Sequence, residues 1–218
     1  MADIVYGRRA VAEAERGRRA VHRVWRAPET DAAELTRLAG SPDHQGVVAE
    51  VDPYPYAGAD EFLARPDCLI VALDQIQDPQ NLGAVARSAE VAGATGLVLT
   101  ERRSASVTPA VAKASAGAVE HLPIARVTNL ADWLVRAKDE GAWIYGADAG
   151  GETNYSDADL TGKVVLVLGS EGAGLRRLVA ERCDLLVSIP VRGRVDSLNV
   201  SATAAVLLFE AYRQRRAA

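Results

Sequence analysis

Three short segments of the chain combine polar side chains with glycine or apolar residues in patterns that suit ligand binding and catalysis. They are residues 81–87, which contain Asn81 and Arg87, residues 169–174, of sequence Gly-Ser-Glu-Gly-Ala-Gly, and residues 188–201, which contain Ser197 and Asn199. Each segment borders an apolar run of strand length. Because open α/β proteins bind ligands at the carboxyl ends of their strands, the three segments together predict one pocket.

Residues 169–174 are the most glycine-rich of these segments. Their Gly-x-x-Gly-x-Gly spacing is neither the dinucleotide fingerprint nor a phosphate-binding P-loop, and Glu171 would repel a phosphate. The glycines would instead let the backbone approach a flat ligand such as an adenosine moiety. Taken alone, the segment is more simply a plain β–α turn.

The polar residues of the other two segments also have ordinary structural explanations. Asn81 suits the N-cap of a helix over residues 81–91, and Arg87 lies on the flank of its apolar face, where it reaches either solvent or a cleft. Ser197 and Asn199 each suit the cap of a last helix. They also lie among apolar residues where the chain re-enters the core, so their polar groups need protein or ligand partners.

The elements that position these segments follow from hydrophobic periodicity. Residues 1–52 predict a small unit with helices at 8–16 and 31–38 and strands at 21–25 and 46–51; residues 53–66 begin with two prolines and predict a linker. In residues 67–218, strands are predicted at 69–73, 97–99, 143–146, 164–168 and 185–189, and helices at 81–91, 130–138 and 197–213. This alternation predicts an α/β fold with a mostly parallel sheet.

Composition and charge narrow the class of protein. About half of the 218 residues are hydrophobic, yet no apolar run approaches the roughly 20 residues that span a bilayer. The first residues lack a cationic-then-apolar leader, and the two cysteines have neither disulfide nor metal-ligand spacing. We therefore expect a cytoplasmic protein with no membrane segment and no metal.

Although the net charge is −4, charge is unevenly distributed, and residues 1–27 contain a cluster of seven arginines. Such a cluster is typical either of a phosphate-binding face or of a solvated helix face. For the remaining distinctive residues, we expect Cys68, Cys183 and the three tryptophans to pack in the core. His44 suits a purely structural role.

The combination and order of the three segments resembles the motifs of the SpoU family of RNA ribose 2′-O-methyltransferases, within the SPOUT superfamily. The resemblance covers about residues 67–214. Residues 6–14 and 44–49 resemble the small L30e-like RNA-binding domain that precedes many such enzymes, although the stretch between Val21 and His44 is shorter than usual. The resemblance implies an RNA-facing or domain-bridging role for His44 as an equal alternative to the structural one. The most similar pattern is that of enzymes that methylate a guanosine ribose in 23S ribosomal RNA.

The resemblance implies a fold, a cofactor and partners. It implies a C-terminal trefoil knot in the sheet domain, S-adenosyl-L-methionine as cofactor, RNA as substrate, and a homodimer formed through the knot and the C-terminal helix. The residues that match cofactor-binding positions are Thr100, Gly169, Gly172, Ile189 and Leu198. The residues that match catalytic positions are Asn81, Arg87, Glu171, Ser197 and Asn199.

Roles for the matched polar residues follow from the chemistry. An arginine stays protonated in proteins, so Arg87 suits a clamp on the phosphate beside the target ribose better than a base. Glu171, with Asn81 and Asn199, would orient Arg87 and the ribose. Two alternatives stay open: methylation of a tRNA ribose, and a non-catalytic RNA-binding relative of the same fold.

Overall fold

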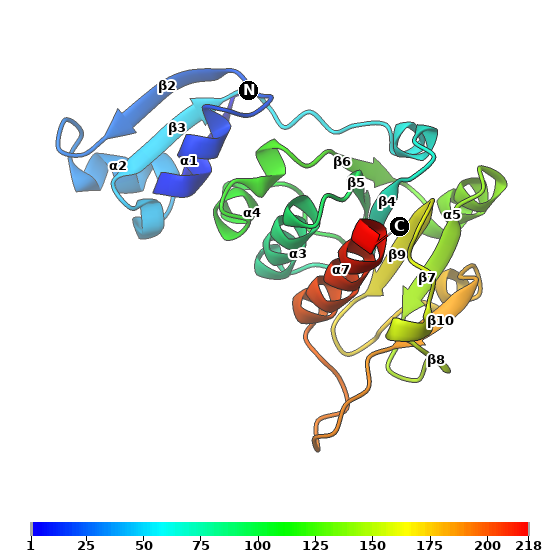
Figure 1. The fold of residues 1–218 in the computed structure, drawn as a ribbon. Helices are drawn as coiled ribbons and strands as arrows, with labels where there is room; N and C mark the ends of the chain where they lie inside the picture. The colour runs from blue at the N-terminus through cyan, green and yellow to red at the C-terminus, as the bar shows by residue number, and fades with distance from the viewer. Residues whose placement is uncertain (1, 218) are drawn as a thin grey trace.

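Apolar strands from the second part of the chain form a seven-stranded sheet, shown in Figure 1. The computed structural model describes residues 2–217. Strand order is β6-β5-β4-β9-β7-β10-β8, and each pairing between these strands is parallel. The strands are β4 (Leu69–Asp74), β5 (Gly96–Thr100), β6 (Ile124–Val127), β7 (Trp143–Ala147), β8 (Thr153–Asn154), β9 (Val164–Gly169) and β10 (Leu185–Ser188).

Helices cover both faces of this sheet, because its central strands are apolar on both sides. The helices are α3 (Pro79–Val91), α4 (Pro109–Ala114), α5 (Leu130–Asp139), α6 (Arg177–Ala180) and α7 (Val200–Ala217). In β9, Val164 and Leu166 pack in the core with α3 and α7, whereas Val165 and Val167 pack in the core with α5 and α6. Successive strand residues point to opposite faces, so the continuous apolar run fills both layers. The parallel α/β prediction is confirmed.

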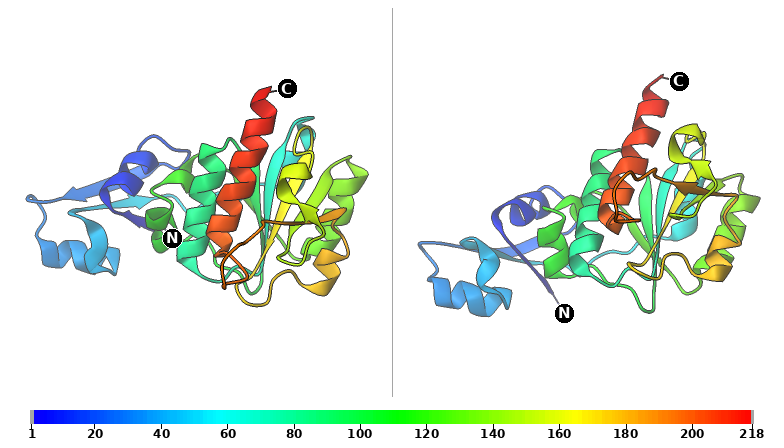
Figure 2. Two further views of the ribbon diagram at one scale, coloured as in Figure 1. Left: turned by 60° about the horizontal axis from the view of Figure 1, so that its bottom comes forward. Right: turned by 90° about the horizontal axis from the view of Figure 1, so that it is seen from below.

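Residues 3–51 form a separate three-stranded antiparallel sheet of order β1-β3-β2. Its elements are β1 (Asp3–Tyr6), α1 (Arg8–Ala14), β2 (Val21–Arg26), α2 (Ala32–Ala39) and β3 (Val47–Val51). Helix α1 packs on one face and α2 on the other. Both views in Figure 2 place this unit at one end of the molecule, beside α4. The apolar side chains under α1 belong to the same core as those of β4 and α3.

A buried ion pair fastens the two units together. The Arg19 Nε donates to Glu120 Oε2 at 2.9 Å, and the side chains of Arg19 and Glu120 are 3% and 0% exposed. Glu120 belongs to the short 3-10 helix η3 (Ala118–Glu120) of the large unit. Beside this pair, Arg18 donates to the backbone carbonyls of Glu120 and Leu122 at 3.2 and 3.1 Å. Two of the seven clustered arginines therefore hold the fold together instead of forming a solvent face.

The substitution Arg19→Ala is expected to lower the free energy of unfolding by about 3 kcal/mol, because it leaves the Glu120 carboxylate buried without its partner. Urea denaturation of the full chain measures this loss. Arg16→Ala is the matched control, since the Arg16 side chain is 72% exposed in its pair with Glu13 and such pairs contribute less than about 1 kcal/mol. Equal losses in the two variants would contradict a fastening role for Arg19.

Several predicted boundaries and side-chain environments need correction. Helix α3 begins at Pro79 with Asp78 as its N-cap, so Asn81 is not the cap. The last helix begins at Val200, three residues later than predicted, and β1, α4, β6 and β8 were not predicted. Trp143 is 56% exposed, whereas Trp133 is fully buried as predicted.

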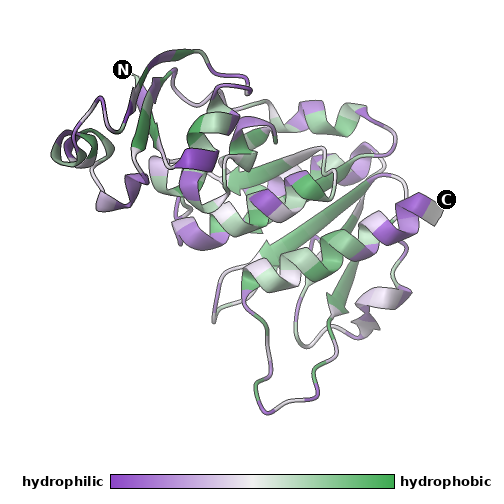
Figure 3. Cartoon of the chain, turned by 60° about the vertical axis from the view of Figure 1, so that its left-hand side comes forward, coloured by the Kyte–Doolittle hydropathy of each residue, from purple (hydrophilic) through white to green (hydrophobic). Residues whose placement is uncertain are grey.

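Figure 3 shows the hydrophobic strands of the large sheet lying beneath helices with mixed polar and apolar faces. In the described part of the chain, no helix combines the length and hydropathy that crossing a membrane requires.

Candidate active site

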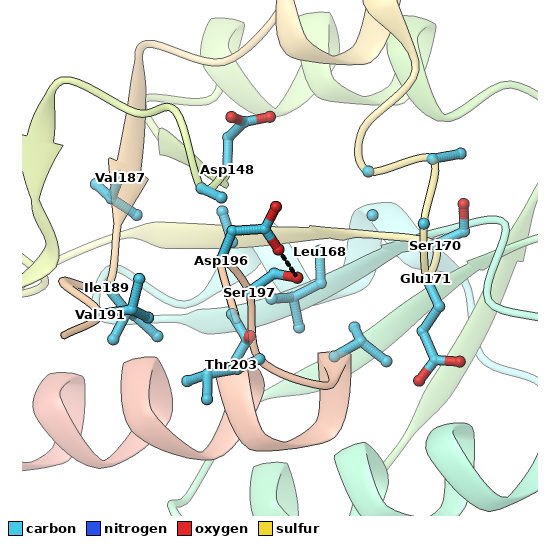
Figure 4. Close-up of a pocket in the computed structure, with 18 residues that line it drawn as sticks. Asp148, Leu168, Ser170, Glu171, Val187, Ile189, Val191, Asp196, Ser197 and Thr203 are labelled. Carbon is cyan, nitrogen blue, oxygen red and sulfur yellow. Dashed lines mark hydrogen bonds between the residues drawn. The ribbon is translucent and has the colours of Figure 1, made fainter. Parts of the chain in front are cut away.

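The carboxyl ends of β9 and β10 and the start of α7 enclose a pocket of about 450 Å³. Figure 4 shows the side chains that line it. Six of the ten predicted site residues are in its lining: Gly169, Glu171, Gly172, Ile189, Ser197 and Leu198. The two later segments identified in the sequence therefore meet at one edge of the sheet, as expected for a parallel α/β fold.

Residues 170–174 form a tight turn that closes on itself. The Ser170 amide donates to the Gly174 carbonyl at 3.1 Å, and the Gly174 amide donates to the Ser170 carbonyl at 2.9 Å. A Cβ on Gly169 would lie 2.1 Å from the Gly174 carbonyl carbon. Glycine at position 169 is thus required by the close approach of the loop's own backbone. Gly172 has a φ of +76°, a conformation that favours glycine.

A buried carboxylate fixes the far end of this turn. Asp74, the last residue of β4, has a fully buried side chain. Its Oδ2 accepts from the backbone amide of Arg176 at 2.9 Å, and its Oδ1 accepts from the Arg176 Nε at 2.7 Å. The loop is therefore held at both ends, by Gly169 and by Asp74. Helix α6 begins at Arg177, directly after the residue that makes this anchor.

Three of the predicted catalytic residues form one hydrogen-bonded cluster. The Asn81 Nδ2 donates to Glu171 Oε1 at 2.9 Å, and the Asn199 Nδ2 donates to Asn81 Oδ1 at 3.1 Å. Asn199 Nδ2 also donates to Glu171 Oε1. Because Asp78 caps α3, the side chain of Asn81 is available for this cluster. The cluster unites all three segments identified in the sequence.

Asn199 has two roles at the start of α7. Its Oδ1 accepts from the backbone amide of Ser201 at 2.8 Å and from the Ser201 hydroxyl at 2.6 Å. Those contacts cap the helix, as the sequence suggested. Its Nδ2 then points to Glu171 and Asn81. The cap orients the amide, so the position of the cluster depends on where α7 begins.

The structure does not bring Arg87 or Thr100 to the pocket. Arg87 is exposed and lies six residues beyond Asn81, roughly 9 Å along the helix axis. Thr100 is buried at the end of β5, where its hydroxyl contacts the Ser104 hydroxyl at 2.5 Å and the Arg102 carbonyl at 3.0 Å. Strand β4 separates β5 from β9, whose carboxyl end lines the pocket, so Thr100 lies outside the lining.

The pocket lining is acidic and apolar. Three carboxylates line it, from Asp148, Glu171 and Asp196, and its lining includes no lysine or arginine. Asp148 was missed in the sequence, although it directly follows strand β7 at the same edge of the sheet. Its Oδ1 accepts from the Gly150 amide at 2.8 Å. The apolar part of the lining includes Leu198, which is 44% exposed. Such a lining suits a ligand that joins positive charge to a flat apolar group.

The histidine and cysteines have structural environments. His44 is buried, contacts the Thr36 hydroxyl through Nε2 at 3.2 Å, and accepts from the Gly46 amide through Nδ1 at 3.0 Å. Burial raises the pKa of the Cys183 thiol to about 12, so a thiolate is disfavoured at neutral pH. Cys68 is fully buried. Within residues 2–217, no group of three or more histidine, cysteine, aspartate or glutamate side chains is arranged to hold a metal ion.

Comparison with known proteins identifies the class of enzyme. Residues 68–209 match the model of the SpoU rRNA Methylase family, and the chain belongs to that family. The chain is 40% identical to a Bacillus subtilis protein assigned to the TrmH family of tRNA/rRNA methyltransferases, YacO; the match covers 98% of this chain and 96% of that protein.

Solved structures agree with this assignment over nearly the whole chain. The SpoU methyltransferase AviRb from Streptomyces viridochromogenes, solved in complex with the cofactor AdoMet, superposes with a TM-score of 0.82 at 29% identity and covers 98% of this chain and 90% of its own. An RNA 2′-O ribose methyltransferase superposes with a TM-score of 0.83 at 29% identity, covering 97% and 88%.

Proposed function

We propose that this protein transfers a methyl group from S-adenosyl-L-methionine to a ribose 2′-hydroxyl in structured RNA, with a guanosine of 23S ribosomal RNA as its first candidate substrate. The observation that carries the proposal is the Asn81–Glu171–Asn199 cluster at the rim of the carboxylate-lined pocket. Membership of the SpoU family supports the reaction class. A tRNA ribose is the second candidate, because the B. subtilis relative is named for both tRNA and rRNA.

The residues of the pocket fit the proposed cofactor. S-adenosyl-L-methionine carries a sulfonium and an ammonium group, and the carboxylates of Asp148, Glu171 and Asp196 complement positive charge. Ile189 and Leu198 offer apolar surface for an adenine ring, and the backbone of residues 169–172 can hydrogen-bond its polar edge. A nucleoside triphosphate would meet three like charges here, so the pocket disfavours it.

The proposed reaction mainly requires the protein to align the ribose 2′-hydroxyl with the methyl group of the cofactor. When bound, the cofactor supplies an activated methyl group that the ribose oxygen takes in line, with S-adenosylhomocysteine and a proton as the other products. Glu171 fixes the amides of Asn81 and Asn199 through one oxygen. The two amides and the carboxylate hold the ribose near the pocket rim, which lowers the barrier by orientation.

Further expectations from the family belong to this proposal. We propose a trefoil knot in the C-terminal part of the sheet and a homodimer through the knot and α7, with a cytoplasmic location. We also propose a substrate-binding role for residues 1–52, with residues 53–66 as the linker and 67–218 as the catalytic domain. The chain between β10 and α7 leads from the strand next to the edge strand β8 back to the helix that packs on α3, which is consistent with the knot. Phe209 and Tyr212, 47% and 41% exposed on α7, support the dimer.

Calorimetric titration of the full chain tests the proposed cofactor. We expect S-adenosyl-L-methionine to bind and, at 100 times its Kd, to stabilise the fold by about 2.7 kcal/mol in a thermal unfolding assay. ATP at the same concentration is the control and should give neither heat nor stabilisation. Binding of ATP without binding of S-adenosyl-L-methionine would contradict the charge argument.

Arg87→Ala is expected to lower turnover about 100-fold, because the phosphate beside the target ribose would lose its charged partner. The affinity for S-adenosyl-L-methionine should stay within twofold of wild type, since Arg87 lies outside the pocket. Single-turnover methylation and calorimetry measure the two effects separately. Equal losses of turnover and cofactor affinity would overturn the role of Arg87 as a phosphate clamp.

A further inference from the structure

A second hollow, of about 630 Å³, lies where the N-terminal unit meets the large unit. We call it the junction groove. Its lining residues are Gly7, Arg8, Arg9, Ala10, Gln45, Lys113 and Ala116. One wall is therefore the start of α1 with the turn before β3, and the other is the end of α4.

The junction groove is cationic on both walls. Arg8 and Arg9 come from the N-terminal unit and Lys113 from α4. Arg8 Nε donates to the Gln45 carbonyl at 3.2 Å, which leaves its two terminal amino groups for another partner. The Lys113 side chain is 27% exposed; its Nζ is 3.4 Å from Oδ2 of the exposed Asp43 and 5.5 Å from the centre of the Tyr6 ring. The groove therefore has three cationic side chains, Arg8, Arg9 and Lys113, against the one carboxylate of Asp43.

Arg9 differs from most of the other arginines of the N-terminal cluster. Arg16, Arg19 and Arg26 form ion pairs with carboxylates, and Arg18 donates to backbone carbonyls. By contrast, Arg9 is exposed and has no ion pair or side-chain hydrogen bond among the described residues. Arg23 is exposed and lies 5.0 Å from the centre of the Trp25 ring, outside the groove. Of the seven arginines, Arg8 and Arg9 line the groove.

The backbone around the junction groove is unusual. Gln45 and Ala116 both adopt positive φ, at 55° and 54°, and are two of four non-glycine residues in the described chain that do so; Gly7 has a φ of 96°. Such conformations cost on the order of 1 kcal/mol for residues with a Cβ, and they gather at functional sites. Three residues with positive φ therefore line this groove.

The spacing of the two walls is fixed by the contacts between the units. The buried Arg19–Glu120 pair joins the segment after α1 to η3, which follows α4, and α1 and η3 share one apolar core. On its other side α4 packs closely on α3, since a Cβ on Gly83 would lie 2.4 Å from the Cβ of Ala114. Gly83 is two residues from Asn81. A strand of RNA seated in the groove would therefore lie at a set distance from the catalytic cluster.

We propose that the junction groove binds the phosphodiester backbone of the RNA substrate next to the nucleotide that is methylated, with Arg9 and Lys113 as its phosphate ligands. The proposal rests on the proposed function. It favours RNA over an acidic protein segment because cations face one another across a groove that a phosphate chain can follow. The N-terminal unit would then position RNA as a rigid extension of the catalytic unit.

The test measures equilibrium binding of labelled 23S ribosomal RNA to the full chain over a range of salt concentrations. In the double variant Arg9→Ala/Lys113→Ala we expect affinity to fall about 10- to 100-fold and the slope of log K against log salt to fall by about 1 to 2. Affinity for S-adenosyl-L-methionine should not change. The matched control is Arg65→Ala/Arg136→Ala, which removes two exposed arginines on the α5 side of the sheet.

An unchanged RNA affinity and salt slope in the groove variant, relative to this control, would overturn the proposal. Arg8→Ala provides a second variant with the same expected direction, in case the double variant unfolds. The experiment measures RNA binding and not methylation, so the groove proposal and the proposed function can fail independently of each other. RNA binding that depends on the groove but gives no methylated product would overturn the proposed function alone.

Discussion

Replacing Glu171 by alanine is expected to slow methyl transfer about 1,000-fold, which corresponds to about 4 kcal/mol of transition-state stabilisation. Glu171 accepts from the amides of both Asn81 and Asn199, so its loss frees both side chains at once. The Glu171 side chain is exposed, and the fold should therefore keep its stability. Single-turnover assays with saturating RNA and cofactor measure the rate, and thermal unfolding checks the fold.

The substitution Glu171→Gln distinguishes the effect of the hydrogen bonds made by residue 171 from the effect of its negative charge. The glutamine keeps one oxygen that can accept from the two amides, while the negative charge beside the pocket is removed. We expect a rate between those of wild type and Glu171→Ala. A full wild-type rate in the alanine variant would show that the cluster does not take part in the reaction.

Replacing Gly169 by alanine is expected to weaken binding of S-adenosyl-L-methionine about 100-fold, or about 2.7 kcal/mol. The added Cβ would lie 2.1 Å from the Gly174 carbonyl carbon and 2.4 Å from the Leu175 amide nitrogen. Because both atoms are backbone, the turn over residues 170–174 must move, and it lines the pocket. Overpacking of this kind also costs about 1–3 kcal/mol of stability.

Gly193→Ala is the matched control for this substitution. Gly193 lies in the segment before α7, and the nearest atom to its added Cβ is 3.9 Å away. Calorimetry should show cofactor affinity within twofold of wild type in this variant. If Gly169→Ala also bound the cofactor normally, the turn would not form part of the cofactor site.

The strands at the centre of the sheet could be predicted because each one has a hydrophobic pattern within its own residues. β4 and β9 are uninterrupted apolar runs, and the structure buries them on both faces. The start of α7 was predicted three residues too early, because Ser197 and Leu198 belong to the pocket and only Asn199 caps the helix. Helix α4 was missed although Thr108 and Pro109 are its cap and first residue.

The residues of the candidate site could be chosen from the sequence, but the contacts between them could not be predicted. Asn81, Glu171 and Asn199 were selected by resemblance, yet their contacts join residues 90 and 118 positions apart in the chain. Asp148 was missed because a lone aspartate after a strand carries no distinctive pattern. The structural role of Arg19 was missed because its partner, Glu120, is 101 residues away in the chain.

The most direct test of the account follows the methyl group. The full chain is incubated with methyl-labelled S-adenosyl-L-methionine and 23S ribosomal RNA, with tRNA in a parallel reaction, and the RNA is digested to nucleosides for mass spectrometry. We predict label in a 2′-O-methylated nucleoside, foremost 2′-O-methylguanosine, and a large loss of that label with Glu171→Ala. Label on a base, or no label in either RNA, would contradict ribose 2′-O-methylation by this protein.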